Sequence, residues 1–203
     1  GVESMSMVPM MGNKIAMSPS VFENEHVAIA YGMRITAENV ATQWNVSRED
    51  QDAFAYASHQ KALDAIQSGH FAQEISPYEV IARSADLGAG RIITRNKPIT
   101  DDEGPRADTS LEGLAKLKPV FKARGSVTAG NSSQMSDGAG AVLLASEQAI
   151  KDYGLTPLAR LVSFSVAGVP PEIMGIGPIA AIPKALKQAG LNQDQLDWIE
   201  LNE

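Results

Sequence analysis

Residues 125–139 read Gly125-Ser126-Val127-Thr128-Ala129-Gly130-Asn131-Ser132-Ser133-Gln134-Met135-Ser136-Asp137-Gly138-Ala139, and the apolar run 141–145 follows them. Glycine and alanine let a ligand reach the backbone because they carry little or no side chain. Serine and asparagine add hydrogen-bonding groups of short reach. The composition is therefore typical of a ligand-binding loop. It is equally typical of a polar turn that leads into a strand over residues 141–145.

This run resembles the signature loop of the thiolases, which lies against the pantetheine arm of coenzyme A. Further blocks resemble the same family in the same order. Residues 32–41 resemble the opening of the thiolase loop domain, residues 108–121 the segment that embraces the coenzyme, residues 174–178 the start of the second half of the enzyme, and residues 201–203 the beginning of its Asn-Glu-Ala-Phe box. Each block alone is a weak signal. Together they cover almost the whole chain, so we identify the chain as similar to the thiolases.

The resemblance implies an α/β protein with part of the thiolase fold, namely strands of both similar halves and the loop domain inserted in the first half. On this map residues 1–9 end the N-terminal half and residues 10–131 form the inserted loop domain, which binds coenzyme A. Residues 132–157 hold the last strand of that half and a connection, and residues 158–203 begin the C-terminal half. The sequence shows no convincing internal repeat, so the division into halves comes from the resemblance alone.

The hydrophobic periodicity and the turn residues predict the secondary structure. Helices are expected over 37–44, from the N-cap Ser47 to Gly69, over 111–117, and from Pro178 to Gly190; strands are expected over 1–9, 76–83, 90–94, 138–146, 158–167 and 197–201. Ser47 and Asp50 fit a capping box, and Pro183 should disturb a backbone hydrogen bond inside the last helix. The order strand, helix, strand over 158–201 predicts a parallel crossover.

The composition limits the function classes. The chain has 203 residues, a net charge of −7, 44% hydrophobic residues and no cysteine. The missing cysteines exclude disulfides and thiolate metal sites, and we expect no metal. The acidic balance argues against nonspecific nucleic-acid binding. No run is long enough to span a bilayer, and no secretory signal is visible at the start. Coenzyme A is an anion, so an acidic protein needs a local basic patch to hold it.

Thiolases cleave a 3-ketoacyl-CoA with a second coenzyme A, or run the reverse Claisen condensation, through an acyl-enzyme on a nucleophilic cysteine. They also use a histidine in a Gly-Gly-His-Pro context. The chain has no cysteine, and His26, His59 and His70 lack that context. We therefore expect the middle portion of a thiolase, which is inactive by itself. His59 lies on the apolar stripe of its helix and is expected to be a packing residue.

The resemblance assigns site residues position by position. Asn202 matches the asparagine that holds a water at an oxyanion hole, the kind of site that stabilises an enolate. Met33 and Met174 match residues that line the acyl pocket. The residues matched to coenzyme contacts are Arg106 near the nucleotide end, Leu114, Leu117, Val120 and Phe121 along the channel, and Ala129 and Ser133 at the pantetheine. For the channel residues plain helix packing is an equal alternative, and for Asn202 the alternative is an ordinary strand end.

The chain departs from the family pattern at positions that bear on the substrate. Short-chain acetoacetyl-CoA thiolases carry a histidine where this chain has Gly32, and can carry a serine where it has Gly113. Residues 169–178 resemble degradative 3-ketoacyl-CoA thiolases, which we favour. The alternatives are a short-chain acetoacetyl-CoA thiolase, or a noncatalytic fragment that binds coenzyme A or lipid. A complete enzyme is expected to form a homo-oligomer, dimer or tetramer, in the bacterial cytoplasm, or in mitochondria or peroxisomes of a eukaryote.

Overall fold

The computed structural model describes residues 1–8, 12–14, 16–23 and 27–202. Pro9 and Met10, where the first expected strand ends and the loop domain begins, lie outside the described residues, as do His26 and Glu203. The chain divides into two compact units. Unit 1 comprises Gly1–Gln51 and Leu117–Glu203, and unit 2 comprises Asp52–Lys116.

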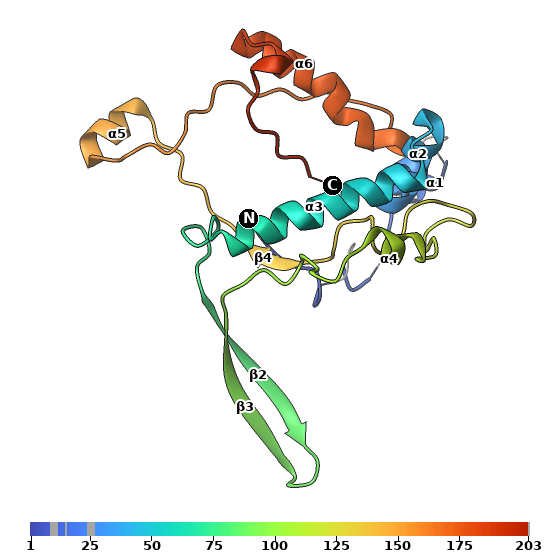
Figure 1. Ribbon diagram of the computed structural model, residues 1–203, viewed down its shortest axis with the longest axis vertical. Helices are drawn as coiled ribbons and strands as arrows, with labels where there is room; N and C mark the ends of the chain where they lie inside the picture. Colours follow the sequence, from blue (N-terminus) through green and yellow to red (C-terminus); the bar gives the residue numbers. More distant parts are fainter. Residues whose placement is uncertain (9–11, 15, 24–26, 203) are drawn as a thin grey trace. The chain divides into compact units, whose positions relative to one another are not determined.

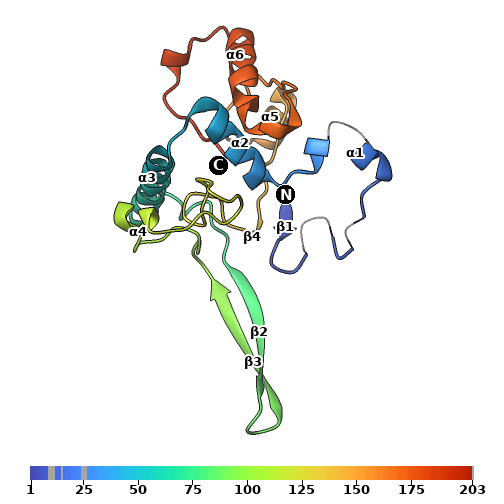
Figure 2. The same ribbon diagram turned by 90° about the vertical axis from the view of Figure 1, so that its right-hand side faces the viewer.

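Unit 1 is built from a short strand pair and several helices (Figures 1 and 2). Its elements are β1 (Val2–Ser4), α1 (Pro19–Glu23), the 3-10 helix η1 (Val27–Ala30), α2 (Met33–Trp44), β4 (Asp137–Ala139), α5 (Glu147–Tyr153), the 3-10 helix η2 (Pro171–Ile176), α6 (Gly177–Ala189) and the 3-10 helix η3 (Gln193–Gln195). β1 and β4 pair antiparallel, with Val2 opposite Ala139. α2 packs against η2, and η2 packs against α6.

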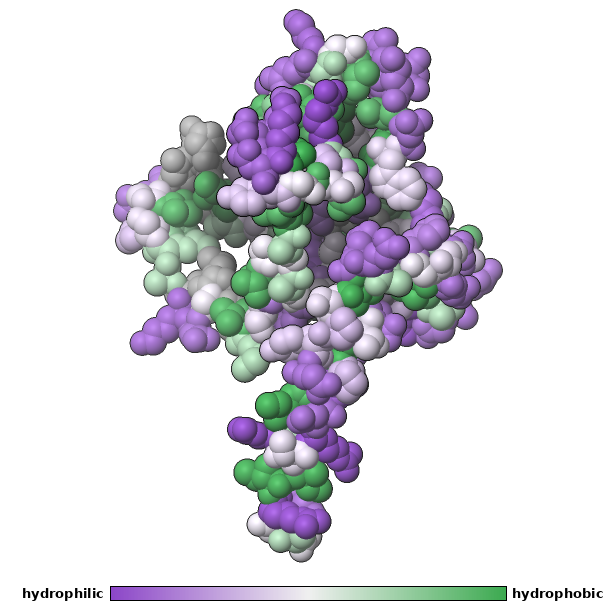
Figure 3. All heavy atoms as spheres, turned by 90° about the vertical axis from the view of Figure 1, so that its left-hand side faces the viewer, coloured by the Kyte–Doolittle hydropathy of each residue, from purple (hydrophilic) through white to green (hydrophobic). Residues whose placement is uncertain are grey.

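Unit 2 contains most of α3 (Arg48–Gln67), the strands β2 (Tyr78–Asp86) and β3 (Arg91–Ile99), and α4 (Leu111–Ala115). β2 and β3 form a long antiparallel hairpin, from Tyr78 opposite Ile99 to Asp86 opposite Arg91 (Figure 1). Apolar side chains lie on its surface (Figure 3), among them Ile81 and Ile92, which are 60% and 71% exposed. The strands expected over 76–83 and 90–94 are confirmed, and each is longer than expected.

Local capping explains where the helices begin and end. The backbone N–H of Asp50 donates to Ser47 Oγ at 3.0 Å, which confirms Ser47 as the N-cap of α3. Ser110 and Ser146 cap α4 and α5 in the same way. α6 ends at Gly190, which takes a left-handed conformation with φ of 69°. Pro183 lies inside α6 without ending the helix, so the loss of its N–H donor is tolerated here.

Several expected strands are wrong in the described part of the chain. Of the strand expected over 138–146 only its first residues pair, within β4, and no strand forms over 158–167 or 197–201. The parallel crossover is therefore absent from these residues as well. A strand needs a neighbour for its backbone hydrogen bonds, which an apolar pattern does not supply. Leu143, Phe164 and Trp198 are accordingly 83%, 74% and 83% exposed.

Of the helices in the described parts of the chain, none combines the length and apolar composition that a membrane crossing requires.

Candidate functional site

The loop 125–133 is fixed by its own side chains. Asn131 Oδ1 accepts a hydrogen bond from the backbone N–H of Thr128 at 2.7 Å, and Asn131 Nδ2 donates to the carbonyl of Ser126 at 3.1 Å. Thr128 Oγ1 accepts from the N–H of Gly130 at 3.2 Å, and Ser132 Oγ donates to the carbonyl of Thr128 at 2.8 Å. Thr128 is 0% exposed. The loop is therefore a closed hydrogen-bonded turn and not a loose connection.

Glu38, on α2, holds the start of this loop from within unit 1. Its carboxylate is buried, at 2% exposure of the residue. The N–H of Val127 donates to Oε1 at 2.8 Å, and the N–H of Ser126 donates to Oε1 and Oε2 at 2.9 and 3.0 Å. The hydroxyl of Ser126 is 3.3 Å from Oε2. Hydrogen bonds to an ionised acceptor are stronger than neutral ones, so this contact fixes the backbone firmly.

Gly125 is required by the same contact. A Cβ atom at position 125 would lie 2.1 Å from Glu38 Oε1, far inside van der Waals distance. Only glycine lets the backbone come this close to the carboxylate. The amide of Gln51 adds a further support, because its Nε2 donates to Ser126 Oγ at 2.9 Å.

The loop presents the predicted pantetheine residues on its outer side. Ala129 and Ser133 are both exposed. The segment 117–121 runs beside the loop, since the N–H of Val120 donates to the carbonyl of Val127 at 3.4 Å. Leu117 and Val120 are 38% and 58% exposed, and Phe121 is half-buried. Unit 1 thus brings together all predicted coenzyme residues except Arg106 and Leu114.

Arg106 and Leu114 belong to unit 2. The exposed Arg106 guanidinium forms a bidentate pair with Asp108, with Nε–Oδ1 of 3.1 Å and Nη2–Oδ2 of 2.9 Å. This hydrogen bonding raises the pKa of Arg106 and lowers the pKa of the Asp108 carboxyl. The N–H of Arg106 donates to Nδ1 of the half-buried His59 at 3.2 Å, which agrees with a structural role for this histidine. Leu114 is 5% exposed, as the packing alternative expects.

Met33 and Met174 lie on elements that pack together in unit 1. α2 contacts η2 through Asn39, whose Nδ2 donates to the carbonyl of Glu172 at 3.0 Å. Met33, at the start of α2, is 55% exposed, and Met174, on η2, is 41% exposed. Neither side chain is buried, so both are open to a ligand. Asn202 is exposed too, in a segment without strand pairing.

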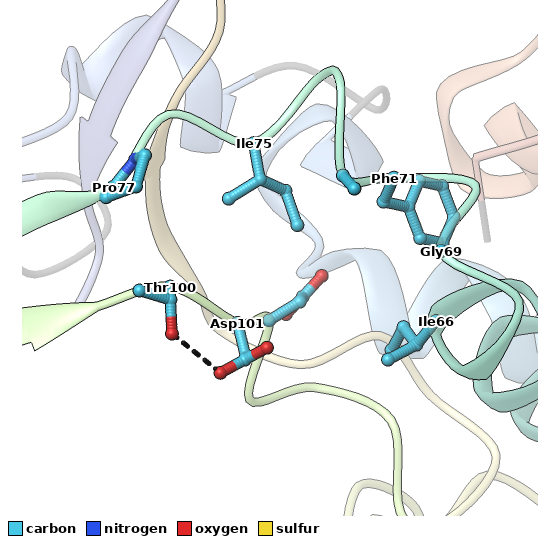
Figure 4. A pocket seen from close by; sticks show the side chains of 9 residues that line it. Ile66, Gly69, Phe71, Ile75, Pro77, Thr100 and Asp101 are labelled. Atoms are coloured by element: carbon cyan, nitrogen blue, oxygen red, sulfur yellow. Dashed lines mark hydrogen bonds between the residues drawn. The ribbon is translucent and has the colours of Figure 1, made fainter.

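A pocket of about 270 Å³ in unit 2 contains none of the predicted residues (Figure 4). Its lining includes the apolar side chains of Ile66, Phe71 and Ile75 and the carboxyl groups of Asp101 and Asp102. Asp101 and Asp102 are exposed. An acidic rim repels an anion, so this pocket is a poor candidate for coenzyme A. The described residues hold no group of three or more His, Cys, Asp or Glu that could bind a metal.

Neither Glu38 nor Asn131 is among the residues predicted to form the site, although both shape it. Glu38 is the only acidic residue of α2, between Ala37 and the polar Asn39 in a helix of otherwise modest polarity. Its partner lies 88 residues away in Ser126, and no local pattern could have identified it.

Comparisons with known proteins agree with the fold. The chain is 47% identical over 205 residues to the 3-ketoacyl-CoA thiolase of Bacillus subtilis, which covers 100% of this chain and 51% of the relative. It is 52% identical over 174 residues to the acetyl-CoA acetyltransferase of Pseudomonas aeruginosa, which covers 85% of this chain and 42% of the relative. The chain thus spans about half the length of the curated relatives it matches.

The solved structure of the dimeric peroxisomal thiolase of Saccharomyces cerevisiae matches with a TM-score of 0.81 and 41% identity, over 97% of this chain and 48% of that chain. This likeness confirms the expected partial thiolase fold. Family models described as "Thiolase, N-terminal domain" and "Thiolase, C-terminal domain" match residues 1–148 and 155–203. Since these matches cover nearly every residue, the chain belongs to the thiolase family.

Proposed function

We propose that this chain forms part of an acyltransferase that cleaves 3-ketoacyl-CoA by thiolysis, or condenses acetyl-CoA in the reverse direction, through an acyl-enzyme. The observation that carries the proposal is the loop 125–133. It is locked on its inner side by Glu38 and Asn131, and it exposes Ala129 and Ser133 on its outer side. The names of two relatives, 3-ketoacyl-CoA thiolase and acetyl-CoA acetyltransferase, support the same reaction class.

Coenzyme A would bind as a substrate along this loop. A pantetheine arm carries amides and methylene groups, so it suits a surface with a small residue, a hydroxyl and apolar neighbours. Ala129 leaves room for the arm, Ser133 offers a hydroxyl, and Leu117, Val120 and Phe121 provide apolar surface. Arg106 would contact the nucleotide end through its guanidinium, which suits a phosphate or an adenine face. Leu114 would line the channel through the small part of its surface that is exposed.

The acyl chain would meet Met33 and Met174, whose flexible side chains adapt to different shapes. Asn202 would fix a water that donates to the developing enolate oxygen. The chain contains no cysteine, so the thiolate nucleophile is not among these residues, and the 203-residue chain should not turn over by itself. Lack of a metal requirement and the domain division at residues 10, 132 and 158 stay predictions.

Two glycines bear on the substrate specificity of the complete enzyme, and the relatives bear on its assembly and cellular location. Gly32 and Gly113 favour the degradative type because they remove the polar side chains of short-chain enzymes; a Cβ at position 113 would also lie 3.1 Å from Ser110 Oγ, the cap of α4. The short-chain acetoacetyl-CoA thiolase stays the second candidate.

We further propose a homo-oligomer for the complete enzyme, in the bacterial cytoplasm or in eukaryotic mitochondria or peroxisomes, because the relatives include a bacterial and a dimeric peroxisomal thiolase.

Calorimetric titration of the 203-residue chain with coenzyme A tests the proposal. We expect saturable binding that 3-ketoacyl-CoA displaces, and we expect Ser133→Ala to weaken it by about 0.5–1.5 kcal/mol, the range for one neutral hydrogen bond. Ser163→Ala is the matched control, because the Ser163 hydroxyl lies outside the loop and donates to the carbonyl of Ala185 at 2.9 Å. Absence of binding by the unchanged chain would speak for a purely structural role.

A further inference from the structure

Glu38 combines deep burial with a carboxylate that accepts hydrogen bonds from the start of the loop 125–133. The residue is 2% exposed, and its oxygens accept from the N–H groups of Ser126 and Val127 and from the Ser126 hydroxyl. A carboxylate withdrawn from water is unfavourable unless hydrogen bonds replace its hydration. The hydrogen bonds that offset the desolvation free energy of this carboxylate come from the loop 125–133, where α2 contacts it.

The contact sorts the loop into an inner and an outer side. On the inner side, the backbone N–H groups of Ser126 and Val127 donate to Glu38. Val127 and the following Thr128 are 4% and 0% exposed. On the outer side Ala129 and Ser133 are exposed. Fixing the backbone at Ser126 and Val127 therefore sets the direction in which the outer residues are presented.

Gly125 shows that the loop is adapted to the carboxylate. A Cβ there would lie 2.1 Å from Oε1 and 2.6 Å from the carboxyl carbon of Glu38. The chain thus carries a glycine where the backbone passes closest to the buried charge. The contact therefore needs both residues: Glu38 supplies the carboxylate, and Gly125 leaves the space that this carboxylate occupies.

We propose that Glu38 is a positioning residue for coenzyme A. It does not touch the ligand, but it holds the loop 125–133 in the conformation that receives the pantetheine arm. The inference rests on the proposed function, because it takes this loop as the coenzyme site. A loop ordered before the ligand arrives spares the complex the entropy of ordering it, which raises affinity.

The substitution Glu38→Gln tests the carboxylate with almost no change of shape. A carboxamide keeps one oxygen acceptor but turns an NH2 group towards the N–H and hydroxyl of Ser126, so one contact becomes repulsive. We expect faster amide exchange at Ser126 and Val127 and about tenfold weaker binding of coenzyme A, as for one lost hydrogen bond to a charged group. Both are measured on the 203-residue chain, by NMR-detected hydrogen exchange and by calorimetry.

Ser146→Ala is the matched control for a general loss of stability. It removes the hydroxyl that caps α5, which accepts from the N–H of Ala149 at 3.1 Å in the same unit. It should lower the free energy of unfolding and leave coenzyme affinity unchanged. If Ser146→Ala weakens binding as much as Glu38→Gln does, the positioning role is wrong.

The outcomes separate the inference from the proposed function. If the unchanged chain binds coenzyme A and Glu38→Gln binds equally well, the inference is overturned and the proposed function stands. If the unchanged chain does not bind, the proposed function fails and the inference falls with it. Should Glu38→Gln not fold, the unchanged chain still decides: amides of Ser126 and Val127 that exchange as fast as the amide of the exposed residue Ala129 would overturn the positioning role.

Discussion

The guanidinium carbon of Arg34 lies 4.8 Å from the centroid of the Phe121 ring, so a cation on α2 stacks over an aromatic side chain of the segment 117–121. Both residues are half-buried. A ring face attracts a cation through its quadrupole, and partial burial strengthens the attraction. The contact joins α2 to the chain beside the loop 125–133, on which the proposed coenzyme site depends.

We predict that Arg34→Met lowers the free energy of unfolding by about 1 kcal/mol, because methionine keeps an apolar stem but loses the cation. Urea unfolding of the single variants and of the double variant with Phe121→Leu measures the coupling between the two residues. Arg160→Met serves as control, since Arg160 is exposed. A coupling free energy of zero would show that Arg34 and Phe121 lie close together without stabilising each other.

The Asp108 carboxyl should titrate below the range of an ordinary aspartate, because the hydrogen bonds and charge of Arg106 lower its pKa. A carboxyl with a lowered folded-state pKa stabilises the fold above its unfolded-state pKa, and this contribution is lost as the pH falls through the folded-state pKa. Carbon-13 NMR titration of Arg106→Gln should show the Asp108 pKa returning upward. Hydrogen bonds with Ser6 lower the pKa of Asp137. This pKa should not move in Arg106→Gln, and it is the internal control.

The same pair bears on coenzyme binding. Arg106→Ala should weaken binding of coenzyme A by about 1–3 kcal/mol, the range for a lost hydrogen bond to a charged group. Asp108→Asn should leave binding unchanged or tighten it, because it releases guanidinium donors that Asp108 now occupies. Calorimetry with coenzyme A and with dephospho-coenzyme A measures both. Unchanged affinity in Arg106→Ala would remove this residue from the site.

The acylation reaction should fail in the 203-residue chain. The sequence has no cysteine, so acetoacetyl-CoA has no thiolate to acylate. Intact-mass spectrometry after incubation should show the unmodified mass. A stable gain of an acetyl group that hydroxylamine removes would point to a nucleophile of another kind and overturn the expected mechanism.

The parts of the fold that local chemistry governs could be predicted from the sequence. The cap at Ser47 and the end of α6 at Gly190 depend on neighbours within a few residues, and the two hairpin strands pair with each other across one turn; the structure confirms all of them. α5 was missed, although Ser146 and Gly154 mark its two ends. Its apolar residues were too few to show a helical period.

The parts that depend on distant partners could not be predicted. The strands expected over 158–167 and 197–201 have apolar patterns, but pairing needs a neighbour that periodicity cannot supply, and none forms among the described residues. Glu38 likewise gains its role only from Ser126 and Val127, which approach it through the tertiary fold. The loop 125–133 was recognised by resemblance, whereas the carboxylate that holds it required the structure.

The role proposed for Asn202 is the most specific among the site residues, because it belongs to a single step of the reaction. In a thiolase chain that contains this segment together with a nucleophilic cysteine, Asn202→Ala removes the amide that would fix the donor water. Losing one such donor lowers turnover about a hundred- to a thousandfold. The loss should fall on the step that makes or breaks the carbon–carbon bond, where the enolate develops. Acylation of the cysteine by acetyl-CoA should be less affected, because that step breaks a thioester bond and no carbon–carbon bond.

Separate measurement of the half-reactions checks this assignment. Rapid-quench mass spectrometry follows acylation of the cysteine by acetyl-CoA, which releases coenzyme A, and steady-state thiolysis of a 3-ketoacyl-CoA reports the carbon–carbon cleavage within the complete cycle. Asn192→Ala is the matched control, because Asn192 is an asparagine whose contacts are explained by the cap of η3. An Asn202→Ala enzyme that loses both half-reactions equally, or neither, would show that Asn202 does not serve the oxyanion. Selective loss of the carbon–carbon step with intact acylation would place it there, because only the enolate requires that donor.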